Sequence, residues 1–539
     1  MHYTSKKIFS KIYNNYGLKY YPKKFKKKIK IKKNFSNIEN EILIKNEKNF
    51  VIDLASQRLK INPSNIWKKK NFKDREDLSS LHRWSWAIKL LSKKKVTNLS
   101  EKKFIEDSLI NWCVKHIDTQ IEKKNIIFEP YNISERICNY LILIKLQILK
   151  PNNFILKNLE KQFLFLFENI EYYKFKLSNH ALNNLRAIYL FSVFTSNKKI
   201  QKYSFEFIDY LLTKFLDKNY FFKFGSSNYQ FIFTKWLLDI YLFSTVKKKK
   251  DKIKRRLVKI LDLLNFFIEV DKNKNKVIPL FGNISPDFEN NWIIKFFSEK
   301  KENYFFKNYW KNLNFGSSKK NIRSKEWIKL KNKKFSIFLR NPKLVGFDFN
   351  HSHNDFFNFV LFYKGKKIIL DPGRENYSFE SLKRDISGKS HNSIFINNKA
   401  IYDDYLIYNV LYKLGLKNIK NCKYYVNTNY RDFVKLRSLE KNFTAIREIY
   451  LKNDYIEIID KIFTKKKSNI KIQFNLNMNK KNLKENKYIE LIHNSKIKNK
   501  KKFIKKNFYK SYGLSYEGTT LLVEFSNINR TKSSLKIKG

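Results

Sequence analysis

The spacing of apolar residues changes near residue 320, and this change constrains the fold more than any other feature of the chain. Between about 50 and 315, apolar residues recur every three or four positions, as in Leu109, Trp112 and Cys113, and this period predicts amphipathic helices. After about 320 they alternate, as in Phe335–Arg340, and alternation predicts strands. Helices followed by strands indicate two juxtaposed domains, the second an antiparallel β-sandwich.

The predicted elements divide the chain into three parts. Predicted helical segments are Trp84–Leu91, Asp107–Ile117, Ile137–Leu149, Phe163–Ile170, Ala181–Phe194, Phe205–Phe215, Phe231–Phe243 and Leu257–Phe267. Predicted strands are Phe335–Arg340, Phe357–Tyr363, Lys367–Leu370, Ser393–Ile396, Asp432–Leu439, Tyr455–Phe463, Ile470–Leu476 and Thr519–Phe525. We expect a basic lead-in over 1–45, an array or ring of packed helices over 46–318 and the sandwich over 319–539, with the boundary in polar Lys311–Arg323. The lysine run around Lys500–Lys502 predicts a solvated loop or sheet edge.

The chain is strongly basic, with a formal net charge of +64 from 112 Lys and Arg against 48 Asp and Glu. Such a field favours polyanionic partners, which include nucleic acid, an anionic lipid surface and an acidic polysaccharide. The lysines are spread over the whole length, which compositional drift explains equally well, so charge alone does not select a partner class. A hydrophobic content of 42% argues against wholesale disorder.

Cysteine usage and the N-terminus bound the class of protein further. Cys113, Cys138 and Cys422 are too few and too scattered for a disulfide framework or a cysteine zinc site. The N-terminus is basic and has no apolar h-region, so no secretory signal peptide is visible. No apolar run approaches the roughly 18 residues of a membrane span. We therefore expect a soluble protein without a transmembrane segment, and the compartment stays open.

A histidine pair stands in the segment Asn350–Asp355. The chain has only eight histidines, and His351 and His353 are two positions apart beside Asp355. If the segment is extended, all three side chains project to one face, because side chains alternate along a strand. Two imidazoles and a carboxylate can bind a metal, move protons, or do both.

Three polar stretches come directly before or at the start of apolar helices. Ser178–Leu182 offers Ser178 or Asn179 as an N-cap, Gly225–Gln230 brings a tyrosine to a helix start, and Pro130–Ile137 brings an arginine. Helix N-termini on one rim of a helical ring form an anion site, because their free N–H groups and dipoles point at the ligand.

Taken together, these segments resemble the heparinase II/III-like polysaccharide lyases. The pieces that carry the resemblance are Leu81–Ala87, Ser134–Ile137, Ser178–Ala187, Gly225–Tyr229, Pro279–Gly282, His351–Asp355, Leu370–Tyr377 and Ser390–Ile396. Their order and spacing are more specific than any one of them. The resemblance implies an N-terminal incomplete α/α toroid followed by a β-sandwich, with the active site between the two.

The resemblance also implies β-elimination at uronate residues of an acidic glycan. Removal of the C5 proton requires that the adjacent carboxylate is first neutralised, after which a base takes the proton and an acid protonates the departing O4. By similarity, Asn179 and His180 neutralise the uronate, while Tyr229 and His351 share the base and acid work. A tyrosine with its usual pKa of about 10 is a weak base, so it needs a cationic neighbourhood. Substrate contacts are expected from Arg136, Gln230 and Arg384, with a surface salt bridge as the alternative role of either arginine.

A structural zinc ion is a further implication, held by His353, Asp371 and His391, which are suitable ligand types. The spacing adds a condition. If Lys364–Gly365 is a hairpin turn, Asp371 pairs near Asn358, about 16 Å along a straight strand from His353. Residues 351–355 must then curl back as a loop, or the zinc is absent.

Two positions depart from the family pattern. Gln230 follows Tyr229 where relatives often carry a histidine, and Asn283 follows Gly282 where an aspartate is common. A catalytically inactive glycan-binding protein of surface-polysaccharide assembly is therefore the alternative to a lyase. Nucleic-acid binding ranks lowest, because no helix-turn-helix, zinc-finger or stacking motif supports it. The oligomeric state stays open.

Overall fold

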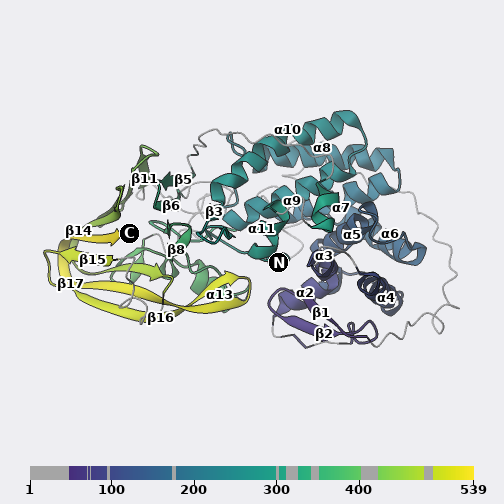
Figure 1. Cartoon of the computed structure of the whole chain (residues 1–539), viewed down its shortest axis with the longest axis horizontal. Coiled ribbons are helices and arrows are strands. Elements are labelled where there is room, and N and C mark those ends of the chain that lie inside the picture. The colour runs from purple at the N-terminus through teal and green to yellow at the C-terminus, as the bar shows by residue number, and fades with distance from the viewer. Residues whose placement is uncertain are drawn as a thin grey trace, which may run out of the picture.

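The computed structural model places a helical half beside a sheet half (Figure 1). It describes residues 48–68, 71–72, 74–93, 98–172, 178–298, 303–310, 324, 326–341, 351–401, 423–478 and 490–539. We call the described residues up to 310 the helical half and those from 324 onward the sandwich half. The predicted lead-in over 1–45 and the predicted boundary segment Lys311–Arg323 lie outside the described residues.

The helical half is built from consecutive helices, and each predicted helical segment overlaps one of them. The helices are α2 (Arg75–Arg83), α3 (Ser85–Ser92), α4 (Leu99–Lys115), α5 (Pro130–Lys145), α6 (Asn153–Glu168), α7 (Asn179–Phe194), α8 (Lys198–Phe215), α9 (Ser227–Phe243), α10 (Lys247–Leu264), α11 (Asn290–Ser298) and α12 (Tyr304–Tyr309). Two short hairpins, β1 (Phe50–Asp53) with β2 (Arg58–Ile61) and β3 (Glu269–Val270) with β4 (Lys276–Val277), accompany them.

Helices α5, α7 and α9 form the centre of this half. They are buried on nearly every side, which is typical of helices that other helices surround. A buried ion-pair network joins them, because Arg186 of α7 contacts Glu135 of α5 at 2.8 Å and Asp239 of α9 at 3.0 Å. The network holds three helix N-termini in fixed relative positions.

The sandwich half is one antiparallel sheet of thirteen strands among the described residues. The strands are β5 (Trp327–Lys331), β6 (Phe335–Arg340), β7 (Phe359–Tyr363), β8 (Lys366–Ile369), β9 (Ile394–Ile396), β10 (Lys399–Ala400), β11 (Lys423–Thr428), β12 (Phe433–Leu439), β13 (Phe443–Leu451), β14 (Tyr455–Leu476), β15 (Glu490–Ser495), β16 (Lys500–Ser511) and β17 (Leu514–Lys538), and helix α13 (Phe379–Ile386) lies between β8 and β9. The predicted strands Tyr455–Phe463 and Ile470–Leu476 are one continuous strand, β14, whose pairing with β17 is irregular around Ser468.

The sheet folds into the two layers of a sandwich because the long strands β14 and β17 each take part in both layers. The first part of β14 pairs with β13, and its last part pairs with β8 and β9. Apolar residues of β5–β8 and of β12–β14 and β17 therefore share one core. Among the described strands β16 pairs only with β17, so its lysines lie on a sheet edge as predicted.

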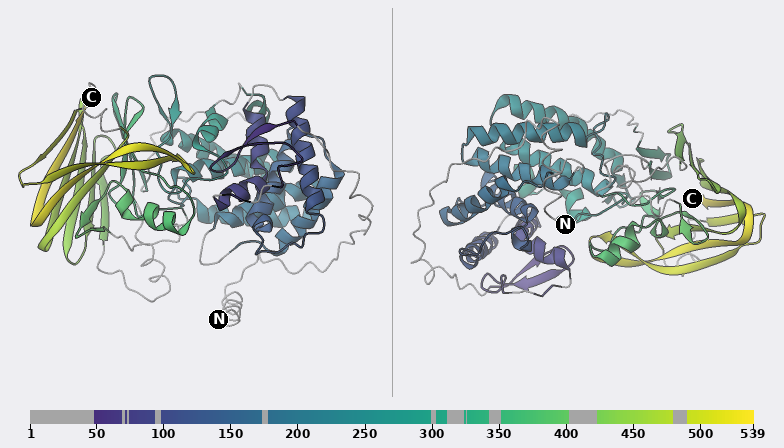
Figure 2. Two further views of the ribbon diagram at one scale, coloured as in Figure 1. Left: turned by 90° about the horizontal axis from the view of Figure 1, so that it is seen from below. Right: turned by 180° about the vertical axis from the view of Figure 1, so that it is seen from behind.

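The two halves are joined by polar contacts as well as by packing. The long hairpin of β16 and β17 reaches toward the helices (Figure 2, left), and at its tip the Tyr512 hydroxyl contacts Asp74 at 3.2 Å. Glu269 of β3 pairs with Lys329 at 2.6 Å and Lys331 at 2.9 Å, both on β5. Among the helices of the described residues, none has the length and hydrophobicity needed to cross a membrane.

Candidate functional site

Two glycines allow the loop at His351 to approach the start of α9. Gly225 has φ +66°, and a Cβ at this position would collide with the side chain of Ser352. Gly282 has φ +69°, and its Cβ would collide with the carbonyl oxygens of His351 and Gly225. Only glycine combines this backbone conformation with this proximity. The Gly225 and Gly282 motifs in the sequence therefore mark the place where the halves meet.

Tyr229 and His351 form a stacked pair across this junction, and we call them the junction pair. Their ring centroids are 3.6 Å apart with planes inclined by 11°. Ser226 caps α9 by accepting a hydrogen bond from the Tyr229 backbone N–H at 3.2 Å, which fixes the helix start. The Tyr229 hydroxyl lies 3.1 Å from the Tyr377 hydroxyl. Burial, followed by the charge of Tyr377, raises the pKa of Tyr229 well above its usual value.

Asn283 connects the junction pair to the second histidine. Its Oδ1 accepts hydrogen bonds from His353 Nε2 and from Arg374 Nη1, each at 2.9 Å. With Oδ1 facing two donors, the amide Nδ2 is the atom that faces His351 Nδ1 at 3.3 Å. Since an amide nitrogen only donates, His351 Nδ1 is the acceptor and the neutral ring carries its proton on Nε2.

Asn179 and His180 occupy the start of α7. Ser178 is the N-cap and accepts from the His180 backbone N–H at 3.2 Å, which confirms one of the two predicted caps. His180 is partly exposed, and its Nδ1 lies 3.0 Å from Glu171 Oε1. Asn179 is buried. The glutamate is thus placed to orient the imidazole.

The structure records no direct contact between His180 and the junction pair among the described residues. An aromatic chain links them instead. The His180 ring is 4.7 Å from that of Tyr131 on α5, Tyr131 packs on Trp236 of α9, and Trp236 contacts Phe233, which contacts Tyr229. The start of α7 is therefore connected to the junction pair through aromatic residues of α5 and α9.

His353, Asp371 and His391 come together inside the sandwich half, and we call them the metal-ligand cluster. One ligand atom from each lies within 4.8 Å of the others. His353 donates from Nε2 to Asn283, and His391 Nδ1 is 2.9 Å from Asp371. His353 Nδ1 and His391 Nε2 are consequently left buried without a hydrogen-bond partner. Two bare imidazole nitrogens beside a buried carboxylate fit a divalent cation.

The protonation of the two imidazoles differs. Burial, followed by the charge of His391, holds the pKa of His353 well below its usual value. Burial also lowers the pKa of His391, but the charge and hydrogen bond of Asp371 outweigh it, and the net pKa lies above the usual value. His353 is therefore neutral near pH 7, the form that coordinates metal.

Residues 351–355 form a loop, which satisfies the condition that the strand geometry set. The extended arrangement, with three side chains on one face, is wrong, because Asp355 turns away and pairs with Arg340. Arg340 also donates to the carbonyl of His353 at 3.2 Å and so holds the loop. Asp371 lies opposite Asn358, as predicted, with a hydrogen bond of 2.5 Å between their side chains.

Two of the three predicted substrate contacts are not supported by the structure. Arg136 is fully buried in the second turn of α5, where it donates to Gln162 and to the His82 carbonyl and lies 4.4 Å from the Trp112 ring. Gln230 is buried and bonds the backbone of Phe222 at 2.9 and 2.7 Å. Both side chains are held inside the helical half by these contacts.

Arg384 is half-exposed on α13, yet it is occupied by acidic neighbours. It pairs with Glu375 and with Asp385. These two ion pairs compete with any substrate carboxylate for the guanidinium. Arg384 is therefore a surface residue whose guanidinium is held by two ion pairs.

Four residues with contacts in the site escaped sequence reasoning as functional residues. Tyr377 and Arg374 were visible only as members of the Leu370–Tyr377 motif, and the Arg374 guanidinium lies 4.4 Å from the Tyr377 ring centroid. Asn283 was noticed only as a departure from the family pattern. Glu171 carried no signal, because one glutamate in a polar link has no distinguishing neighbour in the sequence.

Comparison with known proteins agrees with this arrangement. Residues 317–504 match the family model described as heparinase II/III-like, C-terminal. This part of the chain is similar to that family. The matched residues include His351 of the junction pair, its neighbour Tyr377 and the whole metal-ligand cluster. The family resemblance predicted from the sequence is thereby confirmed. No curated protein matches the sequence.

Solved structures extend the likeness to the helical half. Heparinase III is similar with a TM-score of 0.60 at 13% identity, covering 88% of this chain and 79% of that one. The heparinase III-BT4657 gene product has a TM-score of 0.57 at 14% identity over 88% and 80%. Heparan sulfate lyase HepC from Pedobacter heparinus has a TM-score of 0.53 at 14% identity over 89% and 80%. These matches confirm the predicted toroid followed by a sandwich.

Proposed function

We propose that the protein is a polysaccharide lyase that cleaves an acidic, uronate-containing glycan by β-elimination at the junction of its two halves. The observation that carries the proposal is the junction pair. A tyrosine from a helix start and a histidine from the other half, stacked at 3.6 Å, provide two proton-transfer groups on one substrate site. The lyase fold supports the reaction class, and the name of HepC supports an acidic glycan as the substrate class.

In this proposal Tyr229 is the acid. Because burial raises the pKa of its phenol, the hydroxyl stays protonated at neutral pH and is ready to give its proton to the departing O4. Tyr377, at 3.1 Å from that hydroxyl, orients it.

His351 is the proposed base. To take the C5 proton at Nε2, the ring must first carry its proton on Nδ1, the atom that Asn283 now faces with its amide nitrogen. Asn283 therefore holds the base in its less useful tautomer, and turnover includes a shift of that proton.

The start of α7 is the proposed carboxylate site. Partly exposed His180 is held by Glu171, and the amide of Asn179 is at the same helix N-terminus, where backbone dipoles favour an anion. Neutralising the uronate carboxylate lowers the barrier to loss of the C5 proton.

A divalent cation, zinc by its donor set, is part of the proposal. His353 Nδ1, His391 Nε2 and the Asp371 carboxylate would hold it. When bound, the cation supplies positive charge that ties together the segments before β7, after β8 and before β9.

A glycan-binding protein without turnover is the second candidate. The observation that favours it is that both members of the junction pair hold a proton in the resting arrangement, so neither is a ready base. Binding through the α7 start would survive in such a protein while elimination would not.

The test is incubation of the purified chain with a panel of uronate polymers while the ultraviolet absorbance of the unsaturated product is followed. We expect one or more polymers to give the signal, and Tyr229→Phe and His351→Ala each to lower it by about 100-fold or more. Phe233→Leu, which alters a neighbouring ring without a proton-transfer group, is the matched control. Affinity for a glycan without product from any polymer would support the binding protein and overturn the lyase.

A further inference from the structure

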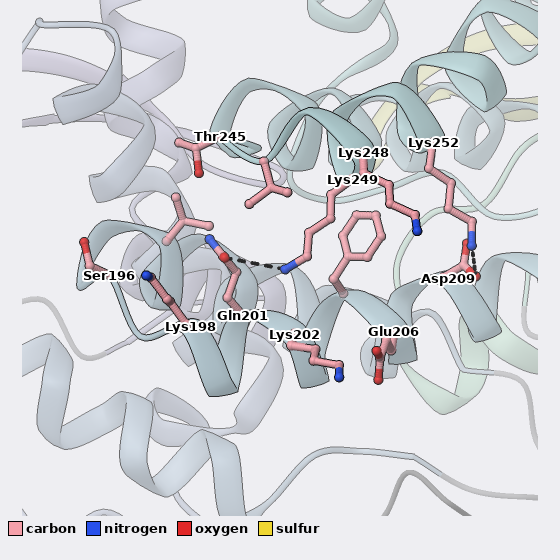
Figure 3. Close-up of a pocket in the computed structure, with 13 residues that line it drawn as sticks. Ser196, Lys198, Gln201, Lys202, Glu206, Asp209, Thr245, Lys248, Lys249 and Lys252 are labelled. Carbon is pink, nitrogen blue, oxygen red and sulfur yellow. Dashed lines mark hydrogen bonds and ion pairs between the residues drawn. The ribbon is translucent and has the colours of Figure 1, made fainter.

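A lysine-lined pocket lies in the helical half away from the junction, between α8 and α10. Its volume is about 670 Å³. Figure 3 shows Lys248 and Lys249 of α10 extending toward α8, which carries Lys198 and Lys202. The rim contains Lys198 and Lys202 of α8 and Lys248, Lys249 and Lys252 of α10.

No ion pair with an acidic residue is recorded among the described residues for four of the five rim lysines, namely Lys198, Lys202, Lys248 and Lys249. Lys252 pairs with Asp209 at 2.8 Å. Lys249 contacts the neutral Gln201 at 3.5 Å and lies 5.5 Å from the Phe205 ring centroid. Burial, followed by the opposing charges of Glu206 and Lys202, leaves the pKa of Lys249 lowered. An anion in the pocket would stabilise the charged form of Lys249 against this burial.

The start of α10, beside this pocket, has a charge and a cap that are unfavourable at a helix N-terminus. Four lysines, Lys247–Lys250, occupy the first turn, where the helix dipole disfavours positive charge, and that turn contains no acidic residue. Val246 is the N-cap and makes no side-chain hydrogen bond, so the first backbone N–H groups are also unsatisfied by side chains. A bound anion would stabilise both features.

The remaining lining groups distinguish among anions. Phe205 and Val246 give the pocket an apolar part, and Gln201, Ser196 and Thr245 add neutral hydrogen-bonding groups. Glu206, which also lines the pocket, accepts hydrogen bonds from hydroxyl groups, which a sugar ring supplies beside its carboxylate. Lysines, hydroxyl partners and an apolar surface together suit an acidic sugar better than a nucleic-acid backbone.

We propose that this pocket is a second binding site for an acidic oligosaccharide, separate from the junction site. Its lysines bind carboxylates of the sugar chain, and its apolar part contacts the C–H face of a ring. The choice of a uronate ligand rests on the proposed function, whereas the anionic character of the site rests on the pocket alone. Such a site would hold a long glycan on the protein while another segment of it occupies the junction.

The test is calorimetric titration of the full chain carrying Tyr229→Phe, which prevents turnover, with a uronate hexasaccharide near physiological ionic strength. We expect two hexasaccharides per chain. Lys202→Gln/Lys248→Gln should weaken one of the two sites by at least tenfold. The charge-matched control Lys466→Gln/Lys467→Gln, on an exposed part of β14, should retain both sites.

A second measurement locates the ligand independently of the variants. The hexasaccharide should protect Lys248 from acetylation by a lysine reagent several-fold more than it protects Lys466, as mass spectrometry would quantify. If the junction has no glycan function, one hexasaccharide binds and the pocket variant alone removes it. The proposal is overturned if the pocket variant keeps every site, if the control loses as much affinity, or if an oligonucleotide of equal charge protects Lys248 better than the hexasaccharide does.

Discussion

The two histidines of the Asn350–Asp355 segment end in clusters that are built in opposite ways. The junction pair takes one residue from each half, so it exists only when the halves dock. The metal-ligand cluster takes all three residues from the sandwich half. Asn283 contacts both histidines. His351 and His353 are thus only two positions apart. His351 belongs to a site that forms when the halves dock, whereas His353 belongs to a cluster within one half.

Gly225→Ala should have the largest effect, because it disturbs the close approach of the two halves at the junction pair. The substitution forces a side chain into a left-handed conformation and against Ser352, which together cost about 2–5 kcal/mol. Denaturant unfolding should show this loss, and any lyase activity should fall with it. Metal content per folded chain should not change.

A rescue variant sharpens the same experiment. Gly225→Ala/Ser352→Gly removes the side chain that the new Cβ meets and should recover part of the lost stability. Equal destabilisation of the single and double variants would show that the close approach of the halves is not the cause.

His353→Ala should affect the metal-ligand cluster rather than the junction pair. We expect about one zinc per chain in the parent protein by elemental analysis, and loss of that metal in the variant, because a buried imidazole nitrogen with no other partner is removed. Chelation of the parent should lower its unfolding midpoint but leave that of the variant unchanged. His116→Ala, which removes a mostly buried imidazole from the helical half, is the control and should keep the metal. A metal-free parent protein would remove the site.

Glu269→Gln should weaken docking in a pH-dependent way. Burial raises the pKa of Glu269, but the charge of Lys329 and hydrogen bonds from both lysines outweigh burial, so the net pKa lies below its usual 4.5. A depressed carboxylate pKa stabilises the folded protein above pH 4.5, and this contribution is lost as the pH falls through the folded-state pKa. We expect about 2 kcal/mol of destabilisation at pH 7 and much less at pH 3.

The comparison for Glu269 is a pair of unfolding curves at the two pH values. Asp454→Asn, which removes an exposed partner of Lys334, serves as the control and should change stability little at either pH. A penalty for Glu269→Gln that is the same at pH 3 as at pH 7 would contradict the ion-pair explanation.

Asn283→Asp should have the smallest structural effect and the most informative one. The carboxylate keeps an oxygen for His353 and Arg374 and offers its other oxygen to His351 Nδ1, which would then carry the proton. His351 Nε2 becomes a base, so we expect turnover to rise several-fold with little change in unfolding midpoint. The steady-state turnover rates of Asn283→Asp, measured beside those of Asn283→Ala, would test this expectation. A fall in turnover would mean that His351 acts as an acid.

Much of this organisation could be predicted from the sequence. The helical and alternating periods depend on which residues can be buried, and burial patterns are local. The N-cap at Ser178 and the lysine edge at β16 also follow from neighbours in the chain. Family motifs such as Gly225–Tyr229 indicated where the candidate site lies, because a glycine directly before a helix allows another segment to approach closely.

Other features were decided only by tertiary structure. Arg136 and Gln230 lie within seven residues of helix starts, yet the direction in which each side chain leaves its helix turns it into the core. Tyr377 and Glu171 gain their roles from partners far along the chain. The sequence alone determined two halves and the residue types at their junction. Docking decided which of those residues touch, because contacts between halves depend on relative orientation, which no local pattern encodes.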